Sequence, residues 1–74
     1  MMKTSGTVIW SDQNRGMFKV RCENGRTALV EILDTIDISV GDTITGDLMN
    51  YGGDVVLHSS ENAENFDAMI QDLD

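Results

Sequence analysis

The chain has 74 residues, with 13 Asp and Glu against 5 Lys and Arg, and its formal net charge at pH 7 is −8. A domain of this size buries only about 60% of the surface of its unfolded chain, which leaves no room for a large enclosed active site. The single cysteine excludes an intramolecular disulfide, and no Cys/His cluster has metal-ligand spacing, so we expect no metal and no other cofactor. No apolar run approaches the roughly 18 residues of a membrane span and no signal-peptide core is present, so we expect a cytoplasmic protein that does not bind membranes.

Charge is distributed unevenly along the chain. Residues 1–26 hold five cations against two acids, a net charge of +3, whereas residues 27–74 hold the other 11 acids and no Lys or Arg. The overall charge argues against nucleic-acid binding, because Lys and Arg supply most of the affinity for phosphates. The asymmetry nevertheless indicates an anionic partner for the first third of the chain. The alternative is that both halves are simply solvated surface.

The first predicted elements are three antiparallel strands. Residues 4–10 form a β-branched run with an aromatic end, and a polar loop follows at residues 11–16. Residues 17–23 and 26–32 alternate on either side of Asn24-Gly25, a dipeptide typical of a type I′ hairpin turn. The alternation of the second strand predicts one core face and one outer face. The core face holds Phe18, Val20 and Cys22, and the outer face holds Met17, Lys19 and Arg21.

Two further strands follow a segment whose state remains open. Residues 33–40 have a mixed pattern that fits either a short helical turn or an irregular crossing. After a turn at Gly41, residues 43–49 and 55–59 read as strands that are separated by a second glycine turn. Five short strands with one longer connection predict an all-β fold, a small five-stranded antiparallel Greek-key barrel of the oligonucleotide-binding (OB) type over residues 1–60.

Residues 61–74 are predicted to form an acidic amphipathic helical tail. Four apolar side chains recur at helical spacing, namely Phe66, Met69, Ile70 and Leu73. A helix this short is marginal alone, so the apolar stripe needs to pack against the barrel or against another protein chain.

The first third of the sequence resembles the cold-shock domain, a five-stranded barrel related to S1-like OB-fold domains. Gly6, Val8 and Trp10 match its Gly-x-Val-x-Trp pattern, and the run from Arg15 to Val20 matches the start of its second strand. The resemblance implies binding of single-stranded nucleic acid on the barrel face. The four positions of the family's aromatic platform correspond to Met17, Lys19, Leu29 and Glu31, so this chain lacks those aromatic residues.

The hairpin also resembles that of bacterial translation initiation factor one, through Met-Phe-x-Val, Glu-Asn-Gly and a later Gly-Asp. That family binds RNA with basic residues, which implies an RNA-binding role for the cations here. The present chain departs from the pattern because it has no Lys or Arg after Arg26.

These observations predict weak, largely non-sequence-specific binding of single-stranded RNA or DNA. The candidate contacts are Trp10, Arg15, Met17, Lys19 and Arg21. Trp10 would stack on a base if it is exposed, but strict alternation from Val8 would place it in the core. The cations would contact phosphates, or alternatively would only solvate the face or pair with Glu31 across the hairpin.

The alternative function is a degenerate OB fold that acts as a protein–protein interaction module and forms part of a larger protein. Its partner would bind through the stripe of Phe66, Met69, Ile70 and Leu73 or through an open strand edge. No nucleophile–base arrangement, metal motif or phosphate-binding loop is present in the sequence, so we do not expect an enzyme and assign no catalytic residue.

Overall fold

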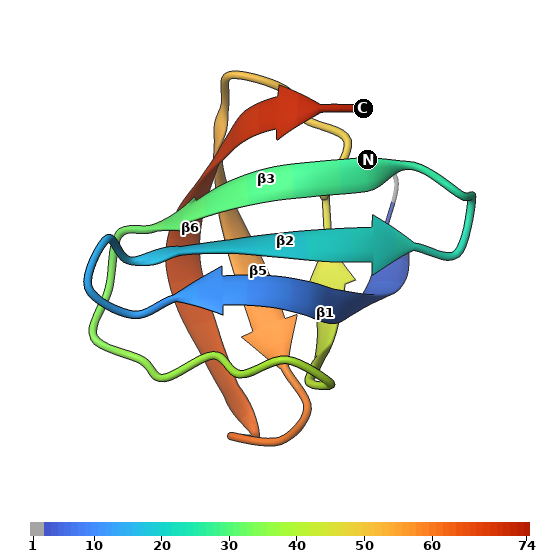
Figure 1. Ribbon diagram of the computed structural model, residues 1–74. Coiled ribbons are helices and arrows are strands. Elements are labelled where there is room, and N and C mark those ends of the chain that lie inside the picture. Colours follow the sequence, from blue (N-terminus) through green and yellow to red (C-terminus); the bar gives the residue numbers. More distant parts are fainter. Residues whose placement is uncertain (1–2) are drawn as a thin grey trace.

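The computed structural model describes residues 3–74, which form a closed barrel of six antiparallel strands (Figure 1). The order around the barrel is β1-β2-β3-β6-β5-β4. The strands are β1 (Thr4–Asp12), β2 (Met17–Cys22), β3 (Thr27–Ile32), β4 (Thr43–Gly46), β5 (Asp54–Ser59) and β6 (Glu64–Leu73). The all-β barrel that the sequence predicts is therefore confirmed, but with six strands instead of five.

The barrel consists of two three-stranded meanders. We call β1–β2–β3 the first meander and β4–β5–β6 the second; in Figure 1 the first lies across the front of the second. Residues 33–42 connect them and bring β4 next to β1, while β6 pairs with β3. The order β4-β1-β2-β3 is that of a Greek key, in which a fourth strand returns by a long connection to lie beside the first.

The core lies between the meanders and is built by alternating residues. On β2 the buried side chains are Phe18, Val20 and Cys22, as the sequence predicts. The phenyl rings of Phe18 on β2 and Phe66 on β6 lie 6.2 Å apart, centroid to centroid, in a tilted arrangement that joins the two meanders.

Two buried side chains outside the strands close the ends of the barrel. The connection of residues 33–42 carries Ile38, which is fully buried, and in Figure 1 this segment runs below β1. Leu48 lies just after β4 and is also fully buried. Because the first segment enters β4 and the second leaves it, the two side chains lie at opposite ends of the barrel. The segment 33–40 is thus an irregular crossing rather than a helix.

The β2–β3 hairpin is confirmed, but the predicted type I′ turn is wrong. Gly25 has a φ of 86°, whereas Asn24 does not have the positive φ that a type I′ turn requires. The N–H of Gly25 donates to Cys22 O at 2.9 Å, and the N–H of Cys22 donates to Arg26 O at 2.7 Å. This is a three-residue loop in which glycine takes the left-handed position. The side chain of Asn24 instead accepts a hydrogen bond from the N–H of Arg26 at 2.9 Å.

The predicted C-terminal helix is also wrong, because residues 64–73 form the strand β6. Phe66, Ala68 and Ile70 alternate into the core, and the outward-facing Met69 lies between two of them. A register shift opposite Leu29 and Val30 skips Gln71, so that Leu73 again lies on the core side. The spacing that resembled a helix therefore comes from a strand with a bulge, since one extra residue reverses the faces of the strand beyond it. The predicted tail is thus part of the barrel wall, between β3 and β5.

Candidate nucleic-acid interface

A β-bulge turns Trp10 out of the core. Val8 is paired with the buried Val20, but Trp10 is paired with the exposed Lys19, so Ile9 is the extra residue on β1. Strict alternation would have placed Trp10 inside with Val8; the bulge reverses the faces, and the Trp10 side chain is 37% exposed. The sequence leaves open whether Trp10 lies in the core or on the surface, and in the structure it faces outward.

Lys19 lies beside the indole ring of Trp10. Its Nζ is 5.7 Å from the ring centroid, within the range of a cation–π contact. On its other side Lys19 lines a surface hollow of about 190 Å³ together with Thr27, Leu29, Asp72 and Asp74. Lys19 thus stands between an aromatic side chain and two carboxylates.

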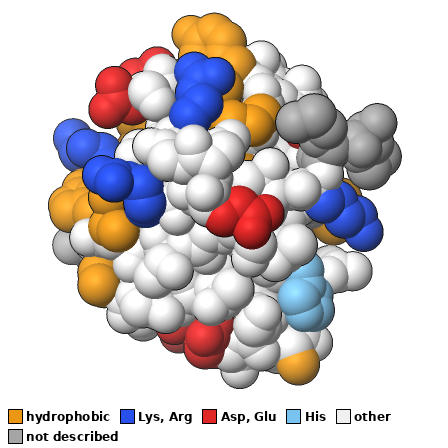
Figure 2. All heavy atoms as spheres, turned by 90° about the vertical axis from the view of Figure 1, so that its right-hand side faces the viewer, with side chains coloured by type: hydrophobic (Ala, Val, Ile, Leu, Met, Phe, Trp, Pro, Cys, Tyr) orange, Lys and Arg blue, Asp and Glu red, His pale blue; other side chains and the backbone are white. Residues whose placement is uncertain are grey.

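Arg21 and Met17 lie on the same outer face of β2 as Lys19. The Arg21 side chain is exposed, and its Nε donates to Thr27 Oγ1 on β3 at 3.1 Å. Met17 is half-buried and pairs with Glu31 across the hairpin. The outer face of β1 and β2 therefore brings together four of the five predicted contact residues, namely Trp10, Met17, Lys19 and Arg21. Figure 2 shows this side of the barrel at its left edge, where Lys and Arg side chains lie next to hydrophobic ones.

Arg15 is set apart from this group. It lies in the β1–β2 turn, and its Nε is 3.8 Å from Asp12 Oδ2. Asp12 Oδ1 also accepts hydrogen bonds from the N–H groups of Asn14 and Arg15, so the carboxylate organises the turn. Arg15 is the one cation within residues 3–74 that has a carboxylate oxygen within 4.0 Å.

Glu31 does not neutralise the cations of β2. It lies opposite Met17, whereas Lys19 lies opposite Leu29 and Arg21 opposite Thr27. Glu31 Oε1 instead accepts a hydrogen bond from Gln71 Nε2 of β6 at 2.5 Å. The cross-hairpin ion pair that the sequence offers as an alternative is therefore not formed.

Two features of this surface could not be predicted from the sequence. Ile9 and Val40 are both exposed, and they flank one hydrogen bond, which runs from the N–H of Gly41 to Val8 O. Ile9 adds apolar surface next to Trp10 along β1, but the bulge that exposes Ile9 has no marker in the sequence. Asp72 and Asp74 line the same hollow as Lys19 because β6 pairs with β3, a placement that a helical tail would not give.

The potential metal ligands and reactive side chains outside this face are dispersed, hydrogen-bonded or buried. Within residues 3–74 no group of three or more His, Cys, Asp and Glu side chains is arranged to hold a metal ion. His58 Nδ1 is hydrogen-bonded to Asn65 Oδ1 on the neighbouring strand, at 2.8 Å. Burial is the main cause that raises the pKa of the Cys22 thiol, which disfavours the reactive thiolate.

Comparisons with protein-family models, with curated proteins and with solved structures found no match to this chain. In residues 3–74 no helix is long and apolar enough to cross a membrane.

Proposed function

We propose that the chain binds single-stranded RNA or DNA, weakly and with little sequence preference, on the outer face of β1 and β2. The observation that carries the proposal is the bulge that brings Trp10 outward beside Lys19, with Arg21 on the same face. A Greek-key barrel of the OB type, as the resemblance to cold-shock domains implies, agrees with this use of the first strands.

Trp10 supplies a surface on which a base can stack. Base–aromatic stacking contributes about 1–3 kcal/mol per base and tolerates any base, because every base has a π face. The platform positions of the related family hold Met17, Lys19, Leu29 and Glu31 here, so one stacked base is the most that this face offers. We therefore expect low affinity.

Lys19, Arg21 and Arg15 supply the phosphate contacts. Lys19 and Arg21 are exposed, and neither has a carboxylate oxygen within 4.0 Å. Asp72 and Asp74 line the hollow beside Lys19, but the other carboxylates of the second meander lie farther away on a barrel whose principal extents are 25, 21 and 20 Å. These extents are larger than the Debye length of about 8 Å at physiological salt, so the far carboxylates are largely screened from a strand on this face.

The test is a titration of the fluorescence of Trp10, the single tryptophan, with short single-stranded RNA and DNA over a range of salt concentrations. Three phosphate contacts predict a log–log salt slope of about −2, at about 0.7 per contact. The double variant Lys19→Ala/Arg21→Ala should reduce the slope by about 1.4. Lys3→Ala/Arg26→Ala is the matched control, since it removes two cations elsewhere on the surface and should preserve most of the binding.

Two results would contradict the proposal. One is the absence of any fluorescence change at low salt, where electrostatic attraction is strongest. The other is an equal loss of binding in both double variants, because this would show that overall charge, and not the face of β1 and β2, determines the interaction.

A further inference from the structure

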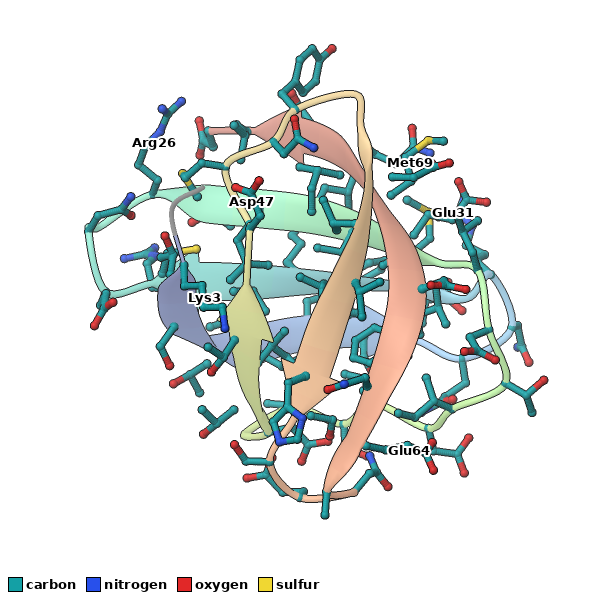
Figure 3. All side chains as sticks on the ribbon, turned by 180° about the vertical axis from the view of Figure 1, so that it is seen from behind. Lys3, Arg26, Glu31, Asp47, Glu64 and Met69 are labelled. Atoms are coloured by element: carbon teal, nitrogen blue, oxygen red, sulfur yellow. The ribbon has the colours of Figure 1, made fainter. Side chains whose placement is uncertain are left out.

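A second surface, centred on β5 and β6 and extending to Glu31 and Leu33 at the end of β3, combines apolar and acidic side chains in an alternating pattern. One row across the strands contains Leu33, Asp67 and Val56, because Leu33 N–H donates to Asp67 O and Asp67 pairs with Val56. The next row contains Glu31, Met69 and Asp54. We call these six residues the acidic–apolar face. Figure 3 shows Glu31 and Met69 of this face side by side on β3 and β6.

Two apolar members of this face, Leu33 and Val56, border a hollow. It has a volume of about 350 Å³ and is lined by Leu33, Asp54, Val55, Val56 and Asp67. Val56 is 60% exposed although it lies in the middle of β5, and Leu33 is also exposed. A hollow of this size, lined by aliphatic side chains, has room for one apolar side chain of a partner.

The carboxylates of the face have no cationic partner in the described part of the chain. The single ion pair within 4.0 Å among residues 3–74 joins Arg15 to Asp12, in the β1–β2 turn. Residues 27–74, which supply every member of this face, contain no Lys or Arg. Glu31, Asp54 and Asp67 therefore produce a negative potential around the hollow, and within residues 3–74 none of them has a Lys or Arg nitrogen within 4.0 Å.

We propose that the acidic–apolar face binds a basic segment of a partner protein that carries an apolar anchor. The anchor occupies the hollow between Leu33 and Val56, and Lys or Arg side chains on either side of it approach Asp54 and Asp67. Charge complementarity selects such a partner, because the same face of a second copy would bring its own Glu31, Asp54 and Asp67 against these carboxylates and would be repelled. The barrel is closed and offers no free edge, so recognition uses side chains rather than added strand pairing.

The test is an NMR titration of the isotope-labelled chain with a short peptide that alternates Lys and Leu. We expect salt-sensitive binding with chemical-shift changes at Leu33, Val56 and Asp67. Val56→Ser should weaken binding about tenfold through the loss of apolar contact. Asp67→Asn should weaken it about fivefold through the loss of one exposed charge pair.

Two control variants match these changes on other surfaces. Val40→Ser removes an exposed valine of similar exposure (64%) from the connection between the meanders, and Asp72→Asn removes one carboxylate of β6 beside Lys19. Neither should weaken peptide binding beyond the effect of net charge. Asp72→Asn should instead strengthen nucleic-acid binding, which keeps the tests of the two surfaces separate.

Several outcomes would overturn the proposal. Equally tight binding of a peptide that alternates Lys and Ser would show that charge alone drives the interaction and that the hollow plays no role. Equal losses in Val40→Ser and Val56→Ser, or shifts confined to β1 and β2, would place the contact elsewhere. Concentration-dependent self-association through Val56, with no peptide binding, would assign the face to a second copy of the chain.

Discussion

The first meander carries Lys19 and Arg21 on its outer face, whereas the second meander contains no Lys or Arg at all. Both meanders have three antiparallel strands and share one core. The charge asymmetry of the sequence therefore becomes an asymmetry between two sides of one barrel. Its boundary lies where β3 meets β6, since Lys19, Leu29 and Asp72 lie in one row across these strands. A net charge of −8 describes neither side, so it is a poor guide to the partners of this protein.

The meanders also differ in their hairpin turns. In the β2–β3 turn the left-handed position is occupied by Gly25, with a φ of 86°. In the β5–β6 turn it is occupied by Ala63, with a φ of 52°, the one non-glycine residue with positive φ in residues 3–74. Glycine takes this conformation without steric cost, but alanine does not. The first turn is thus encoded locally, whereas the second is held against a local preference by its surroundings.

The largest expected effect comes from breaking the contact between the meanders. Phe66→Ala should lower the free energy of unfolding by about 3–5 kcal/mol, because it leaves a cavity beside Phe18. Met69→Ala on the outer face should lower it by less than half as much, since Met69 is only half-buried. Equilibrium unfolding in urea measures both values. Phe66→Leu is a milder version, should Phe66→Ala fail to fold. Equal losses for Phe66→Ala and Met69→Ala would contradict the strand assignment of residues 64–73.

This contrast explains how much of the fold could be predicted from the sequence. The hairpin of β2 and β3 has a turn dipeptide and clear alternation, so its strands could be placed to within a residue. For β6 the pattern of Phe66, Met69, Ile70 and Leu73 fits a helix equally well. The state of β6 is determined by pairing with β3 and β5, which are distant in sequence, and by a bulge at Gln71. Hydrophobic periodicity alone does not contain that information.

The candidate nucleic-acid interface was predictable to a similar degree. Lys19 and Arg21 follow from simple alternation on β2, and the structure has them on the predicted face. Trp10 could not be assigned, because one bulged residue decides whether it faces the core or the solvent. The placement of Asp72 beside Lys19 was likewise out of reach, since it depends on β6 being a strand.

The two turns allow a matched pair of substitutions with opposite expected signs. Ala63→Gly should stabilise the fold by about 0.5–1 kcal/mol, because it removes the strain of a left-handed alanine. Gly25→Ala should destabilise it by about 1 kcal/mol. This second effect is conformational, since a Cβ at Gly25 would meet no atom within 4 Å. For a domain of this size, thermal unfolding should show midpoint shifts of about 4–8 °C per kcal/mol.

Changes of the same sign in the two variants would show that the turns do not differ as described. Ala28→Gly provides the control for glycine itself. Ala28 is fully buried in the strand β3. A glycine there removes packing from the folded state and raises the conformational entropy of the unfolded chain. It should therefore destabilise the barrel, in contrast to Ala63→Gly.

The smallest expected effect concerns Cys22, whose position on the first meander makes the stability of the shared core depend on pH. Burial raises the pKa of its thiol in the folded state above that in the unfolded state. The folded state therefore favours the protonated thiol. The resulting stabilisation is complete below the ordinary thiol pKa of about 8.5, and it is lost as the pH rises through the pKa of the thiol in the folded state. The free energy of unfolding, measured relative to Cys22→Ala, should be constant up to about pH 8 and should decline above it. Taking the difference removes the contribution of every group that both proteins share. A difference that stays constant up to about pH 10 would mean that the thiol ionises equally in both states, and hence that this end of the first meander admits water to its core.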